Sequence, residues 1–80
     1  MTSLAELLRE LHRDLEAAGI ETPAADAELI VGHVLGESRG RVQALALMGA
    51  EAEAAAAAAA RDLAAQRASR VPPQHLTGRA

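Results

Sequence analysis

The chain has 80 residues, half of them apolar, and contains no cysteine, phenylalanine, tyrosine or tryptophan. This length allows one small domain with a thin aliphatic core, and the lack of cysteine excludes disulfides and thiolate zinc sites. The longest alanine run, residues 54–60, is far shorter than a membrane span, and Glu6 and Glu10 interrupt the N-terminus where a signal peptide is apolar. We therefore expect a cytoplasmic protein with no membrane segment.

Charge is distributed unevenly along the chain. Residues 1–60 hold ten acidic residues and four arginines, a balance of −6, whereas residues 61–80 hold four arginines and Asp62, a balance of +3. Glu51 and Glu53 at the start of a last helix, and arginines at its end, would complement the helix dipole. The alternative is an anion-binding patch at the C-terminal end.

A first helix is predicted from residue 4 to residue 18. Ser3 and Glu6 have the spacing of a capping box, and Gly19 followed by Ile20 predicts a Schellman stop in which Ile20 contacts Leu15. The apolar stripe of this helix comprises Leu4, Leu7, Leu8, Leu11, Leu15 and Ala18. Its polar side carries the i, i+3 pairs Glu6–Arg9, Glu10–Arg13 and Arg13–Glu16.

A second helix is predicted between Thr22 and Gly36. Thr22 is an N-cap candidate through its hydroxyl, Pro23 suits the first helical position, and Gly36 ends the run. The residues expected on its core-facing side are Ala27, Ile30, Val31, Val34 and Leu35. The connection to the first helix is short, so the two helices should pack as neighbours.

Two further helices follow. Ser38 is a cap for a short third helix carrying Val42, Leu45 and Met48. A fourth helix should run from about residue 50 to residue 68. Its alanines favour helix without indicating a buried face, so it either packs closely against its neighbours or forms a solvated spacer.

The predicted fold is all-α, a small bundle of four to five short helices over residues 1–70. Pro72 and Pro73 cannot extend the last helix, so we assign residues 71–80 to the start of a linker.

No catalytic, cofactor-binding or metal site is predicted in this chain. The histidines lack metal-ligand spacing, the serines lack a base, and no glycine-rich loop follows a strand. Residues 36–38 match the length of a helix-turn-helix turn, which would place Arg39 and Arg41 on a DNA-recognition helix. The acidic balance of residues 1–60 argues against this reading, because phosphate contacts need a cationic surface.

Several motifs together resemble the N-terminal region of the HemK/PrmC family of peptide chain release factor glutamine methyltransferases. They are Ile20-Glu21-Thr22-Pro23, Asp26-Ala27-Glu28-Leu29-Ile30, His33-Val34-Leu35-Gly36 and Gln74-His75-Leu76-Thr77-Gly78-Arg79. The chain departs from many relatives at Arg70-Val71, where they have Gly-Glu, and at Pro73, where they have an aliphatic residue. The departures put in doubt the short final helix that the family usually forms there.

The resemblance implies a non-catalytic, substrate-docking domain. In the family, a helical N-terminal domain is linked to a Rossmann-like domain that uses S-adenosylmethionine to methylate the Gly-Gly-Gln glutamine of class I release factors. The catalytic Asn-Pro-Pro-Tyr motif does not occur in this sequence. The partners implied are a class I release factor and the catalytic domain, with no membrane and no direct nucleic acid, and the chain is expected to be a monomer.

The residues proposed to contact a partner are arginines, chosen by residue type because charge and hydrogen bonding act at a solvated rim. They are Arg39, Arg41, Arg67, Arg70 and Arg79. The alternative function is a stand-alone helical interaction or dimerisation module, with the alanine-rich helix as its contact surface.

Overall fold

The structure, a computed structural model, describes residues 1–69 and contains four helices and a two-stranded antiparallel bridge in this range. The elements are β1 (Thr2–Ser3), α1 (Leu4–Ala17), α2 (Pro23–Leu35), α3 (Arg39–Leu47), β2 (Glu51–Ala52) and α4 (Ala54–Ser69). The all-α bundle predicted from the sequence is confirmed. The linker predicted for residues 71–80 lies outside the described residues.

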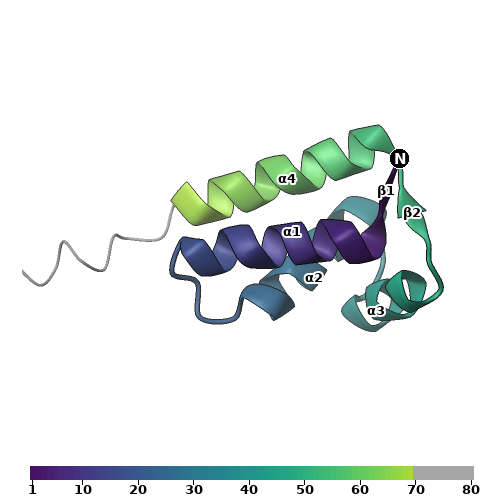
Figure 1. The fold of residues 1–80 in the computed structure, drawn as a ribbon, viewed down its shortest axis with the longest axis horizontal. Helices are drawn as coiled ribbons and strands as arrows, with labels where there is room; N and C mark the ends of the chain where they lie inside the picture. Colours follow the sequence, from purple (N-terminus) through teal and green to yellow (C-terminus); the bar gives the residue numbers. More distant parts are fainter. Residues whose placement is uncertain (70–80) are drawn as a thin grey trace, which may run out of the picture.

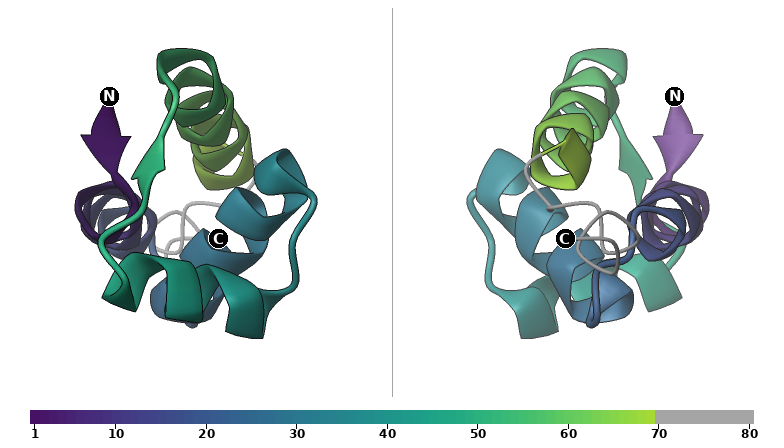
Figure 2. Two further views of the ribbon diagram at one scale, coloured as in Figure 1. Left: turned by 90° about the vertical axis from the view of Figure 1, so that its right-hand side faces the viewer. Right: turned by 90° about the vertical axis from the view of Figure 1, so that its left-hand side faces the viewer.

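Helix α1 supplies most of the large, fully buried side chains of the bundle. It packs against α2, α3 and α4, and α4 runs beside it in the same direction while α2 returns in the opposite direction (Figure 1). Short α3 lies across one end of the bundle, and the C-terminal end of α4 lies at the other (Figures 1 and 2). The four leucines that α1 turns inward are almost fully buried: Leu4, Leu7, Leu11 and Leu15.

The first three helices end in the same way. Gly19, Gly36 and Gly49 have positive φ angles, which an L side chain rarely adopts. At the first stop, Ile20 N donates to Leu15 O at 3.1 Å and Gly19 N donates to Glu16 O at 3.0 Å. These are the two hydrogen bonds of the predicted Schellman motif, and both Ile20 and Leu15 are buried.

Two of the three predicted N-caps are confirmed. The Ser3 and Ser38 hydroxyls accept from the backbone N–H groups of Glu6 and Arg41, each at 3.1 Å, as expected. The predicted capping hydrogen bond of Thr22 is wrong. Thr22 has ψ of 62°, away from the extended geometry that directs a cap hydroxyl at the helix, and its hydroxyl donates instead to Asp26 Oδ1 at 3.4 Å.

The predicted start of the fourth helix at residue 50 is also wrong. Glu51 and Ala52 are extended and pair with Ser3 and Thr2, so Glu51 does not belong to the first turn of α4. Glu53 directly precedes the helix and accepts from Ala57 N at 2.9 Å through its backbone carbonyl. The bridge therefore holds the N-terminus beside the connection between α3 and α4, and α4 begins about one helical turn later than predicted.

The alanine-rich helix belongs to the core. Ala57, Ala60 and Ala64 are at most 3 % exposed and form the face that α4 turns towards α1 and α2. The alternative of a solvated spacer is therefore wrong. On α2, Ala27 and Val31 of the predicted stripe are buried, while Ile30, Val34 and Leu35 pack around them partly exposed. Met48, expected in the core, is 66 % exposed.

Candidate functional site

A groove of about 460 Å³ lies between α1 and α2. Its α1 wall presents residues spaced along one helical side: Leu8, Arg9, His12, Arg13 and Glu16. Its α2 wall presents Ala24, Ala27 and Glu28. The alanines leave the space open because their side chains are short, so the groove has an apolar floor and a charged rim.

A second hollow of about 380 Å³ lies on the other side of α1, towards α4. It is polar, and Glu10 and Arg61 meet across it in a two-point ion pair with N–O distances of 2.8 and 3.2 Å. Hydrogen bonding to the Glu10 carboxylate, together with its charge, raises the pKa of the Arg61 guanidinium. Arg9 and Arg13 line this hollow as well as the first, so they form the ridge between the two.

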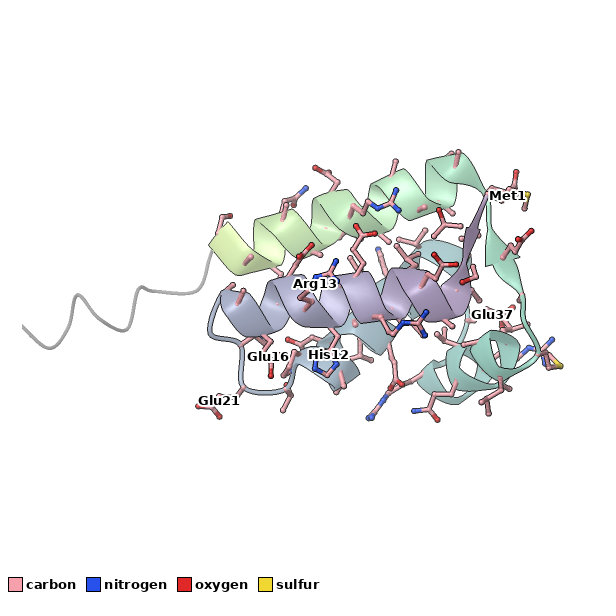
Figure 3. All side chains as sticks on the ribbon, in the orientation of Figure 1. Met1, His12, Arg13, Glu16, Glu21 and Glu37 are labelled. Atoms are coloured by element: carbon pink, nitrogen blue, oxygen red, sulfur yellow. The ribbon has the colours of Figure 1, made fainter. Side chains whose placement is uncertain are left out.

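Figure 3 shows the directions of three α1 side chains. His12 and Glu16 point to the α2 side of the helix, and Arg13 points towards α4 (Figure 3). The three i, i+3 ion pairs predicted on this helix are absent from residues 1–69. Glu6 instead accepts a hydrogen bond from the Ser3 hydroxyl at 3.2 Å, and Glu10 forms an ion pair with Arg61. At Glu10 a long-range partner thus replaces the local one.

The rim of the groove is fixed at Glu28. This carboxylate accepts from Arg39 Nε at 2.6 Å and from Gln43 Nε2 at 2.9 Å, which joins α2 to α3. Partial burial raises the pKa of Glu28, but the hydrogen bonds from Arg39 and Gln43 and the Arg39 charge together lower it below its ordinary value. Glu28 is therefore negatively charged at neutral pH, and its carboxylate is already bound by Arg39 and Gln43.

The arginines chosen from sequence occupy separate places. Arg39 is held by Glu28, and Arg67 Nε lies 3.3 Å from Asp26 Oδ2, which joins α4 to α2. Asp26 and Glu28 are two residues apart and so point to different sides of α2. Arg41 is exposed on α3, and within residues 1–69 its side chain makes no hydrogen bond. Arg70 and Arg79 lie outside the described residues.

Sequence reasoning missed Arg9 and Arg13 because it assigned them to local ion pairs. The sequence signal that could have found them is their i, i+4 spacing, which puts two cations on one side of a helix. Within residues 1–69 the structure shows no cluster of three or more side chains suited to a metal ion. In the same range no helix is both long and apolar enough to cross a bilayer.

The described residues do not fit S-adenosylmethionine. The strands are two residues long, and no glycine-rich loop connects a strand to a helix in this range. Such a loop is what would hold the cofactor against a helix N-terminus. Residues 1–69 therefore lack the strand and loop that would hold the cofactor.

A family model and two curated relatives point to the same protein family. The model of the PrmC N-terminal domain family matches residues 6–78. The release factor glutamine methyltransferase of Mycolicibacterium smegmatis is 42 % identical over 80 residues, which is all of this chain and 27 % of that protein. The one from Deinococcus radiodurans is 43 % identical over 76 residues, which is 94 % of this chain and 26 % of that protein.

This chain therefore spans about a quarter of the length of the curated relatives it matches. No solved structure matches it significantly. The family model covers nearly the whole chain, in agreement with the motifs at residues 20–36 and 74–79. The resemblance seen in the sequence is thus confirmed, and the chain belongs to the PrmC N-terminal domain family of release factor glutamine methyltransferases.

Proposed function

We propose that this chain is the non-catalytic docking domain of a cytoplasmic methyltransferase that modifies the Gly-Gly-Gln glutamine of class I release factors. In this proposal a separate catalytic domain holds S-adenosylmethionine and transfers the methyl group. The helical domain binds the release factor and orients it beside that catalytic domain. The observation that carries the proposal is the family match over residues 6–78.

The partner contacts that we propose are the solvent-facing arginines. Arg41 is the first of them, because its exposed side chain is not held by an acid within residues 1–69. Arg39 and Arg67 already pair with Glu28 and Asp26, so each would contact the partner with the part of its guanidinium group that remains free. Arg70, at the end of the segment that we assign to the bundle, and Arg79, in the segment that we assign to the linker, complete the set.

The proposal is tested by removing residues 1–69 from the full methyltransferase. Methylation is then measured on two substrates, an intact class I release factor and a short peptide containing Gly-Gly-Gln. We expect KM for the intact release factor to rise at least tenfold, because docking contacts are lost, and the rate on the peptide to stay within twofold. Unchanged methylation of the intact release factor by the shortened enzyme would refute the docking role.

A further inference from the structure

Arg9 and Arg13 form an arginine pair whose charge is not neutralised by an ion pair in the described part of the chain. The ion pairs of residues 1–69 are Arg39–Glu28, Arg61–Glu10 and Arg67–Asp26. The four-residue spacing places the two arginines about 6 Å apart along the axis of α1. Both are exposed, so the pair presents two adjacent positive charges on a chain whose net charge is −3.

Two of the acids near this pair, Glu10 and Glu28, are paired with other arginines, whereas Glu6, Asp14 and Glu16 form no ion pair within residues 1–69. Glu6 is hydrogen-bonded to Ser3, Glu10 is bound by Arg61, and Glu28 is bound by Arg39 and Gln43. Glu16 is the remaining acid lining the groove, and it lies near the C-terminal end of α1, beyond the arginine pair. The end of the groove nearest Arg9 is therefore cationic.

The groove beside the pair is apolar at its floor. Leu8 lines it from α1, and Ala24 and Ala27 line it from α2. A volume of about 460 Å³, open to solvent, is enough for a large aliphatic or aromatic side chain. The surface thus combines an apolar seat with the two guanidinium groups of the ridge beside it, of which Arg13 is directed towards α4 (Figure 3). Guanidinium groups prefer planar carboxylate partners.

We infer that the Arg9–Arg13 pair and the α1–α2 groove bind an acidic segment of the release factor that carries one apolar anchor side chain. The carboxylates of the segment pair with Arg9 and Arg13, and the anchor enters the groove over Ala24. This inference rests on the proposed function and names the surface that performs it. A nucleic acid is disfavoured as occupant, because the chain is acidic overall and has no phenylalanine, tyrosine or tryptophan on which a base could stack.

The charge part of the inference is tested in the full methyltransferase with the double variant Arg9→Gln/Arg13→Gln. Its matched control is Ala55→Glu/Ala59→Glu, which changes the net charge by the same two units at the same spacing on exposed positions of α4. Binding of an intact release factor is measured by fluorescence anisotropy at low and high salt. We expect the arginine variant to bind at least tenfold more weakly at low salt and with a reduced salt dependence, and the control to bind within twofold of wild type.

The groove part is tested by Ala24→Leu, which fills the space above the floor from an exposed position. Its control, Ala58→Leu, adds the same side chain at an exposed position of α4. We expect Ala24→Leu to weaken release factor binding at least fivefold and Ala58→Leu to leave it unchanged. Circular dichroism on each variant shows that the helices are retained.

The outcomes separate the two proposals. If removal of residues 1–69 weakens methylation of the release factor while both the arginine variant and Ala24→Leu bind like wild type, this surface assignment is wrong and the docking role stands. If removal has no effect, the docking role itself fails. Binding of an oligonucleotide that is lost in the arginine variant, without any loss of release factor binding, would also overturn the assignment.

Discussion

Gly32 is buried in α2 where this helix meets the turn into α3. A Cβ atom at this position would lie 2.6 Å from the carbonyl oxygen of Glu37 and 3.5 Å from Cγ2 of Val42. The oxygen belongs to the backbone, and Glu37 N also donates to Gly32 O at 2.8 Å, so neither side can yield without disturbing the end of the helix. The absence of a side chain is therefore what allows the close approach.

We predict that Gly32→Ala destabilises the fold by about 1–3 kcal/mol, the usual cost of overpacking a close contact. The melting temperature followed by circular dichroism should fall by roughly 4–8 °C for each kcal/mol in a domain of this size. Gly40→Ala is the matched control, because a Cβ there meets no heavy atom within 4 Å. It should leave the melting temperature unchanged or raise it slightly by reducing the freedom of the unfolded chain. Equal melting temperatures for Gly32→Ala and wild type would contradict the steric argument.

At this scale the sequence predicted what depends on neighbours in the chain. The Ser3 and Ser38 caps and the Gly19 and Gly36 stops are confirmed because each needs only a few adjacent residues. Gly32 could not be singled out, since the carbonyl that approaches it is placed by the turn geometry. The charged partners on α1 were wrong for a similar reason: Glu10 prefers Arg61, 51 residues away in sequence.

Helix α4 shows, at the level of a whole element, the same limit of prediction from sequence. Seven consecutive alanines predict a helix at any orientation, so only packing against α1 and α2 selects Ala57, Ala60 and Ala64 as the inner face. The start of α4 also depended on a residue that is distant in sequence, because Ala52 pairs with Thr2 near the N-terminus. The small inner face lets the α4 backbone approach its neighbours closely.

We predict that Ala60→Leu costs about 1–3 kcal/mol, because a residue that is 1 % exposed has no room for three more carbon atoms. Ala59→Leu places the same side chain on the exposed side of the same helix turn and should stay within about 0.5 kcal/mol of wild type. Urea unfolding of the two variants measures the difference directly. If both variants unfold at the same urea concentration, the face assigned to the core is not the one that packs.

For the whole molecule, the buried alanine face affects the alternative function. A dimerisation module using the alanine-rich helix would have to use its outer alanines, because α1 and α2 already cover the face formed by Ala57, Ala60 and Ala64. The large apolar side chains left exposed within residues 1–69 are Met1, Leu29, Leu47 and Met48. Leu47 and Met48 are adjacent at the end of α3, and two side chains fall well short of the roughly 800 Å² per partner of a standard interface.

We therefore predict that the 80-residue chain is a monomer. Sedimentation equilibrium at protein concentrations from micromolar to millimolar should give a constant mass near 8.3 kDa. A mass that rises towards twice this value would contradict the prediction. The double variant Leu47→Lys/Met48→Lys then locates the contact, because it restores the monomer only if the end of α3 is the interface. Ala55→Lys/Ala58→Lys tests the outer face of α4 with the same added charge, and rescue by this pair would return the alanine-rich helix to the role of contact surface.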